Sequence, residues 1–146
     1  MDRSDLDAPL RIMTVIWLAL SAGVIMFAVV LYALLTTNSV DIDALDPSLL
    51  VIVAPILMVM MAGGMVVGLR LQGAIPRDAP PEEKIQRYQM ARIVAMALQE
   101  GPALAIMVLS MLAGSRNWII GAAAVGVWTI FLARPRREDL EAILRG

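Results

Sequence analysis

Cysteine and histidine are both absent from this chain of 146 residues, and the two absences exclude much chemistry at once. Without them there is no disulfide, no thiol nucleophile, no zinc site of the usual Cys/His kind, no histidine general base and no histidine ligand for haem. Lysine occurs only at Lys84, so arginine supplies the other basic residues. The net charge of −1 gives no overall basic field for nucleic acid. We therefore predict a non-enzymatic chain with no catalytic residues, no cofactor, no metal site and no nucleic-acid partner.

Polar residues are also scarce, because hydrophobic residues make up 60% of the chain and its mean hydropathy is +0.77. A soluble domain is typically about 45–50% apolar. A helix needs about 20 apolar residues to cross a bilayer, and in lipid its backbone groups must bond within their own segment. We therefore predict an all-α bundle of four transmembrane helices, which forms a single membrane domain over residues 1–146. The four predicted spans are residues 10–35, 48–71, 93–113 and 117–133.

The basic residues are distributed very unevenly between the polar segments. Eleven of the 12 lie before residue 12, between residues 70 and 92, or after residue 133, and Arg116 alone lies elsewhere. The segment between the first two spans has no Lys or Arg and carries Asp41, Asp43 and Asp46. Because basic residues favour the cytoplasmic side, we predict a multi-pass protein of the cell inner membrane with both termini in the cytoplasm.

The two larger polar segments are expected to hold further helical structure. Residues 72–92 begin with a Gly- and Pro-rich break and continue with helix-forming residues, which predicts a cytoplasmic extension of the third span. The tail, residues 134–146, could form a short interfacial helix with Leu140, Ile143 and Leu144 on one side. The alternative is a solvated, charge-rich anchor.

An acidic residue interrupts the third span, where residues 96–105 read MALQEGPALA. Glu100 lies seven residues after the start of the predicted span 93–113, where a charged side chain costs about 2.5–3.5 kcal/mol on insertion scales. Pro102 has no N–H, so it frees the carbonyl of Leu98, and Gly101 loosens the helix beside it. Helices broken in this way supply ion sites in many transporters.

These residues define a candidate site for a proton or a cation. Its members are Glu100, Gln99, the Leu98 carbonyl and Arg92, and the expected helix breaks are Gly101, Pro102 and, in the second span, Pro55. Arg92 lies eight residues before Glu100, about 12 Å along a helix, which is too far for a strong ion pair. The alternative is a structural Glu100 that is protonated and hydrogen-bonded to a neighbouring helix.

Small residues recur at a spacing of four in three of the spans. Such pairs let helix backbones approach closely in lipid, either within the bundle or between subunits. The predicted packing pairs are Ala19 and Gly23, Gly64 and Gly68, and Ala122 and Gly126.

The sequence from Arg92 onward also carries a resemblance. Arg92, the run Ala-Leu-x-Glu-Gly-Pro-Ala at residues 97–103, a fourth hairpin helix and the exit Arg134-Pro135 are similar to the pattern of small uncharacterised four-helix bacterial inner-membrane proteins. The resemblance implies the fold and brings no established activity. We therefore expect a small integral membrane protein with an intramembrane carboxylate site, linked to proton or cation transport. The alternative is a non-catalytic accessory or assembly subunit. Besides the lipid bilayer, the expected partner is a second copy or a larger membrane protein.

Overall fold

The computed structural model describes residues 3–37 and 45–145, with side chains in the first segment from residue 7 onward. This part of the chain is helical and contains no strand. Four segments are long and apolar enough to cross a membrane, which confirms an all-α chain with four candidate spans. The helices are α1 (Arg3–Thr36), α2 (Ser48–Gly73), α3 (Pro81–Leu112), α4 (Arg116–Leu132) and the short α5 (Arg137–Arg145).

The helix ends follow from local chemistry. Before α2, a carboxylate oxygen of Asp46 accepts the backbone N–H of Ser48 at 2.9 Å, and this bond lowers the pKa of Asp46. Helix α3 begins at a proline and carries two glutamates in its first turn, where acidic side chains complement the helix dipole. It ends at Leu112, and Gly114 in the following turn has a φ of 62°, a left-handed conformation that glycine adopts without strain. The resulting tight turn sets α4 directly beside α3.

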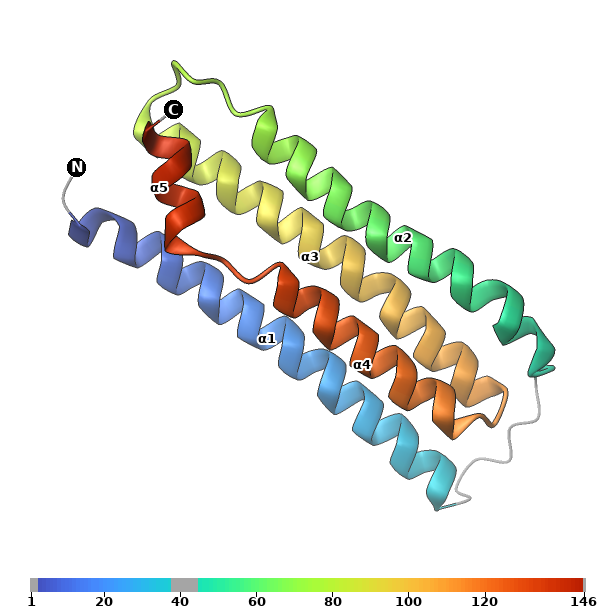
Figure 1. The fold of residues 1–146 in the computed structure, drawn as a ribbon. Helices are drawn as coiled ribbons and strands as arrows, with labels where there is room; N and C mark the ends of the chain where they lie inside the picture. Colours follow the sequence, from blue (N-terminus) through green and yellow to red (C-terminus); the bar gives the residue numbers. More distant parts are fainter. Residues whose placement is uncertain (1–2, 38–44, 146) are drawn as a thin grey trace.

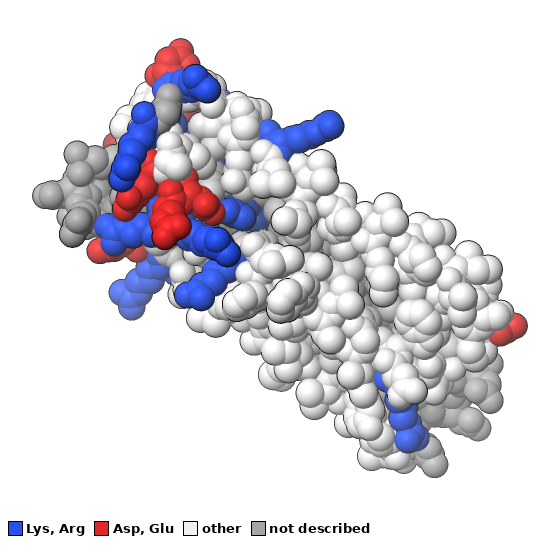
Figure 2. Space-filling model, in the orientation of Figure 1, with Lys and Arg blue, Asp and Glu red and all other residues white. Residues whose placement is uncertain are grey.

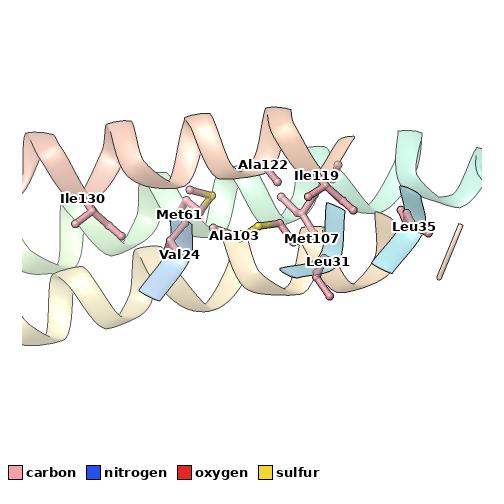
Figure 3. Close-up of a cluster of buried hydrophobic side chains, with 11 residues drawn as sticks. Val24, Leu31, Leu35, Met61, Ala103, Met107, Ile119, Ala122 and Ile130 are labelled. Carbon is pink, nitrogen blue, oxygen red and sulfur yellow. The ribbon is translucent and has the colours of Figure 1, made fainter. Parts of the chain in front are cut away.

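Helix α3 is the centre of the arrangement. It packs against α1, α2 and α4, and α1 also packs against α4, whereas α2 packs almost only against α3 (Figure 1). The indole N–H of Trp17 on α1 donates to the carbonyl oxygen of Ile130 on α4 at 2.8 Å. The main buried cluster draws side chains from all four long helices (Figure 3), among them Val24, Met61, Ala103, Met107 and Ile119.

Charged side chains gather at one end of the elongated molecule (Figure 2). The start of α1, the α2–α3 connection and α5 all lie at this end, and the α3–α4 turn lies at the other (Figure 1). The long apolar stretch between the two ends has the dimensions and surface of a membrane-crossing body.

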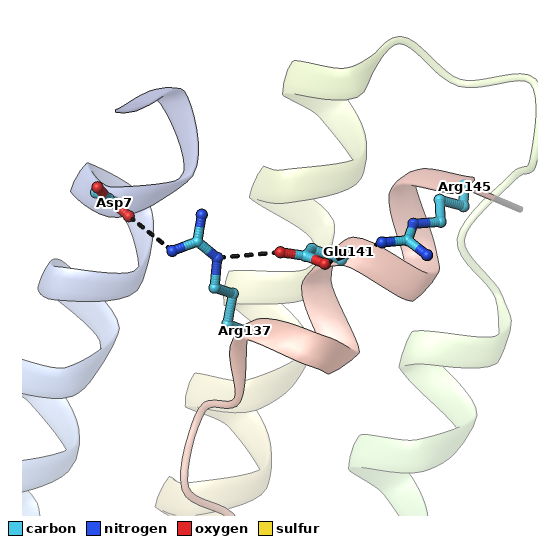
Figure 4. A network of polar contacts seen from close by, with 4 residues as sticks. All are labelled: Asp7, Arg137, Glu141 and Arg145. Carbon is cyan, nitrogen blue, oxygen red and sulfur yellow. Dashed lines mark hydrogen bonds and ion pairs between the residues drawn. The ribbon is translucent and has the colours of Figure 1, made fainter. Parts of the chain in front are cut away.

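The tail forms the predicted short helix, with Leu140, Ile143 and Leu144 in one apolar cluster, but this cluster packs against α1 and α3. The helix is α5, whose Leu140 is fully buried with Met13 of α1 and Tyr88 of α3. Arg137 of α5 forms an ion pair with Asp7 of α1 at 3.5 Å, and within α5 it pairs with Glu141 at 3.0 Å (Figure 4). The apolar side that predicted an interfacial helix therefore packs against protein. Predicting this would have required knowing that α1 and α3 meet at the same end.

Glycines allow the closest helix contacts. A Cβ placed on Gly64 would lie 2.9 Å from the Cβ of Leu98, and one on Gly68 would lie 2.6 Å from the Cβ of Ala95. A Cβ on Gly126 of α4 would lie 2.8 Å from the Cβ of Ala103. These separations are too short for any larger residue, so the three glycines are packing positions inside the chain. Ala122 is buried on the same side of α4 as Gly126. The remaining predicted pair, Ala19 and Gly23, is exposed.

Candidate functional site

Glu100 lies on the side of α3 that faces α1. A Cβ placed on Gly23 would lie 3.8 Å from the Oε1 atom of Glu100, so the carboxyl group lies directly beside the glycine backbone. The side chain is only partly buried. It makes no hydrogen bond and no ion pair with any residue that the structure describes. The hydrogen bond to a neighbouring helix that a structural role requires is therefore not present within residues 3–37 and 45–145.

The predicted helix break beside Glu100 is wrong. Helix α3 continues without interruption through Gly101 and Pro102, and α2 likewise continues through Pro55. A proline removes one backbone hydrogen bond, and neighbouring helices can hold the remaining turns in place. Pro102 is buried among such neighbours, whereas Pro55 is exposed and does not face the site. The Leu98 carbonyl lacks its usual donor at residue 102, but it is part of a continuous helix and not of an open loop.

Gln99 points away from Glu100, toward α2 and α4. Its side chain is 1% exposed, and its Oε1 atom has no hydrogen-bond partner in the described residues. It lines a small cavity of about 30 Å³ between α2, α3 and α4, together with Gln72 and Arg92. A water molecule needs roughly 10–15 Å³ of such space and two to four polar partners. The cavity therefore has the size and the polar lining to take a water.

Arg92 is committed to the junction with α5. Its Nε–H donates to the Tyr88 hydroxyl at 3.2 Å, and its guanidinium group lies 5.3 Å from the centre of the Tyr88 ring. The same guanidinium forms an ion pair with Asp139 of α5. These contacts hold Arg92 about two helical turns from Glu100. The four residues of the predicted site are thus divided between a helix seam, a small cavity and the α5 junction.

Sequence reasoning missed Asp139 and Tyr88, and it named Gly23 only as a packing residue. Asp139 and Tyr88 fix Arg92, and Gly23 makes room for Glu100. Asp139 lies 47 residues from Arg92, and nothing in either segment indicates that they meet. The spacing of Ala19 and Gly23 did indicate that this part of α1 carries small side chains, and it was the only sequence signal for a close contact between α1 and α3.

The chemistry open to this arrangement is limited. Among the described residues, no group of three or more Asp, Glu, His or Cys side chains lies together as a metal site would require. Hard cations take six or more oxygen ligands, and Glu100 alone supplies at most two. A single carboxyl group can, however, exchange a proton or hydrogen-bond to a group from another molecule. Comparison with family models, with curated proteins and with solved structures finds no match that would add a function to these observations.

Proposed function

We propose that this chain is a non-catalytic subunit of a membrane assembly, in which Glu100 forms a polar contact with another polypeptide. The observation that carries the proposal is the carboxyl group at the α1–α3 seam, which has no partner among the described residues. Its insertion into a membrane costs about 2.5–3.5 kcal/mol. Since no described contact offsets this cost, a hydrogen-bond donor from outside the chain is the simplest compensation.

The surface around Glu100 supports close approach by another helix. Gly23 and Ala19 on α1 are exposed, and so are Ala97 and Gly101 on α3. A Cβ placed on Gly101 would meet nothing within 4 Å. Small residues of this kind let transmembrane helices meet backbone to backbone, and interhelical hydrogen bonds then add about 0.6–2 kcal/mol. Glu100 would be the polar group of such an interface.

The mass of the assembly tests this proposal. Tagged protein is extracted from its own host membrane in mild detergent and measured by native mass spectrometry. We expect a complex larger than the single chain of 15.8 kDa. Glu100→Gln should keep it, because an amide still hydrogen-bonds, whereas Glu100→Ala should dissociate it.

The matched control is Glu138→Ala, which removes an exposed carboxylate on α5. This variant should leave the mass of the complex unchanged. A wild-type protein that is already a single chain, with the Glu100→Ala variant equally stable, would contradict the proposal.

A second candidate is proton- or cation-linked transport at Glu100. It is supported by the small polar cavity at Gln99, the residue next to Glu100, whose lining also includes Gln72 and Arg92. A proton needs no ligand besides the carboxyl group, whereas a cation would need oxygen ligands from a second chain. In liposomes that carry a pH gradient, wild-type protein should dissipate the gradient, and Glu100→Gln and Glu100→Ala should both abolish this activity. If Glu100 carries protons, both variants should lose activity in this assay. If Glu100 is an assembly contact, only Glu100→Ala should disrupt the complex, so the two experiments distinguish the two candidates.

The orientation in the membrane is also a proposal. The uneven distribution of Lys and Arg supports placing both termini and α5 in the cytoplasm of a cell whose inner membrane holds the chain. A reporter that is active only outside the cytoplasm should be active when fused at Asp43, which lies outside the described residues, and silent when fused at Asp78. The reverse pattern would invert the topology and place Arg116 on the cytoplasmic side.

A further inference from the structure

A wide apolar groove runs between α1 and α4. Its volume is about 840 Å³, and it lies on the exposed side of both helices. Counting 100° per residue around α1, the groove residues and Gly23 lie on different sides of that helix. The groove is therefore separate from the surface around Glu100 and does not depend on the function proposed for it. Its rims include Ile25, Tyr32, Trp128 and Phe131, and alanines, among them Ala28 and Ala124, supply small side chains between them.

The groove has the length of one membrane leaflet. On α4 it extends from Ile119 to Phe131, which is twelve residues and about 18 Å along the helix axis. The hydrocarbon core of a bilayer is about 30 Å thick, so one leaflet contributes about 15 Å. An acyl chain that lay along the groove would therefore contact the protein across the whole thickness of its leaflet.

A positively charged side chain lies at one end of this groove. Arg116 is the first residue of α4, and its Nη2 atom donates to the carbonyl oxygen of Leu35 on α1 at 3.0 Å. This bond holds the guanidinium beside Thr36, which lines the end of the groove. Arg116 forms no ion pair with any described acidic residue, although it is the single basic residue at its end of the molecule. Within the described residues, four of its five N–H groups have no acceptor, and a guanidinium matches the geometry of a phosphate.

We propose that the groove binds one phospholipid with an anionic headgroup, whose acyl chain lies between α1 and α4 and whose phosphate accepts hydrogen bonds from Arg116. The positive charge of Arg116 at the end of the groove complements the anionic headgroup, and the apolar lining along the groove complements the acyl chain. A transmembrane helix fits the groove less well, because helix interfaces in lipid favour small residues and these rims carry large side chains. Binding would bridge α1 and α4 on their exposed side, where no described side chain fills the space.

The test compares lipid retention by native mass spectrometry, with phosphatidylglycerol and phosphatidylcholine supplied at equal concentration. Wild-type protein should retain one phosphatidylglycerol per chain in preference to phosphatidylcholine. Arg116→Gln should reduce that preference about tenfold, the effect of losing one charge-assisted hydrogen bond. Ala124→Trp should expel both lipids by filling the groove. Arg145→Gln, which changes an exposed arginine at the other end, is the matched control and should change nothing.

Tryptophan fluorescence locates the bound lipid. In vesicles of phosphatidylcholine, dibrominated phosphatidylglycerol should quench the wild-type protein more strongly than dibrominated phosphatidylcholine does, and Trp128→Phe should remove the difference. An unchanged preference in Arg116→Gln would overturn the proposal. Disulfide formation between copies of an Ala124→Cys variant would also overturn it, because the groove would then be an interface between two chains.

Discussion

The two sides of α3 that meet α2 and α1 use glycine in opposite ways. Toward α2, an added Cβ on Gly68 would lie 2.6 Å from the Cβ of Ala95, closer than real Cβ atoms approach. Toward α1, an added Cβ on Gly23 would lie 3.8 Å from Glu100, which is ordinary van der Waals contact. The first contact is closed and apolar, and the second is open and contains a carboxyl group that has no partner among the described residues. The same sequence pattern, a glycine four residues from another small residue, can therefore occur in two structural contexts. One is an interface within the chain, and the other is a surface that is available to another molecule.

The largest effect is expected at the closed contact. Gly68→Ile should separate α2 from α3, because even a Cβ overlaps Ala95 there. Overpacking typically costs 1–3 kcal/mol, and we expect about 3 kcal/mol here because α2 packs against almost nothing else. Thermal unfolding in detergent measures the loss.

Gly63→Ile is the control for Gly68→Ile, because a Cβ on Gly63 would meet nothing within 4 Å. It makes the same change in composition on the same helix and should have little effect. Equal losses at the two positions would mean that the close contact with Ala95 does not hold α2 in place.

The positions of the helices could be predicted from the sequence because hydropathy and capping are local properties. The predicted span 48–71 corresponds to α2 and the span 117–133 to α4. The predicted helical extension forms over residues 81–92 and merges with the third span into α3. The tail was harder to predict because the burial of Leu140 depends on Met13 and Tyr88, which are distant in sequence.

The candidate site could be predicted only in part. The acidic residue within an apolar span singled out Glu100, whose partly buried carboxyl group lies beside Gly23 of α1. However, periodicity does not specify which neighbouring helix lies opposite each residue. Gln99 and Glu100 are adjacent in sequence, yet they face α2 and α1 respectively. The partner of Arg92 was out of reach for the same reason, since the Arg92–Asp139 pair forms only when α5 folds back onto α3.

The second prediction concerns the open contact. If Glu100 has no partner within its own chain, replacing it with leucine should stabilise the isolated chain, because a partly buried polar group without a hydrogen bond is removed. We expect a gain of about 2 kcal/mol, within the usual cost of leaving such a group unsatisfied. Thermal unfolding of the dissociated single chain shows whether the replacement raises or lowers its stability. A loss of stability would instead indicate a partner within the chain and support the structural alternative.

The smallest effect, and the most direct test of the comparison, is expected from alanine at the two glycines. Gly23→Ala should raise stability by about 0.5–1 kcal/mol, because alanine is the better helix former and the added methyl group meets only ordinary contact at 3.8 Å. Gly68→Ala should lower it, because the same methyl group would overlap Ala95 at 2.6 Å and α2 or α3 must shift. Both variants make the same change in a helix, so the intrinsic helix preference cancels between them and only the contact differs. If both variants lowered the unfolding midpoint, the α1 and α2 contacts would both be tight, and the α1 side of α3 would have no room for a partner beside Glu100.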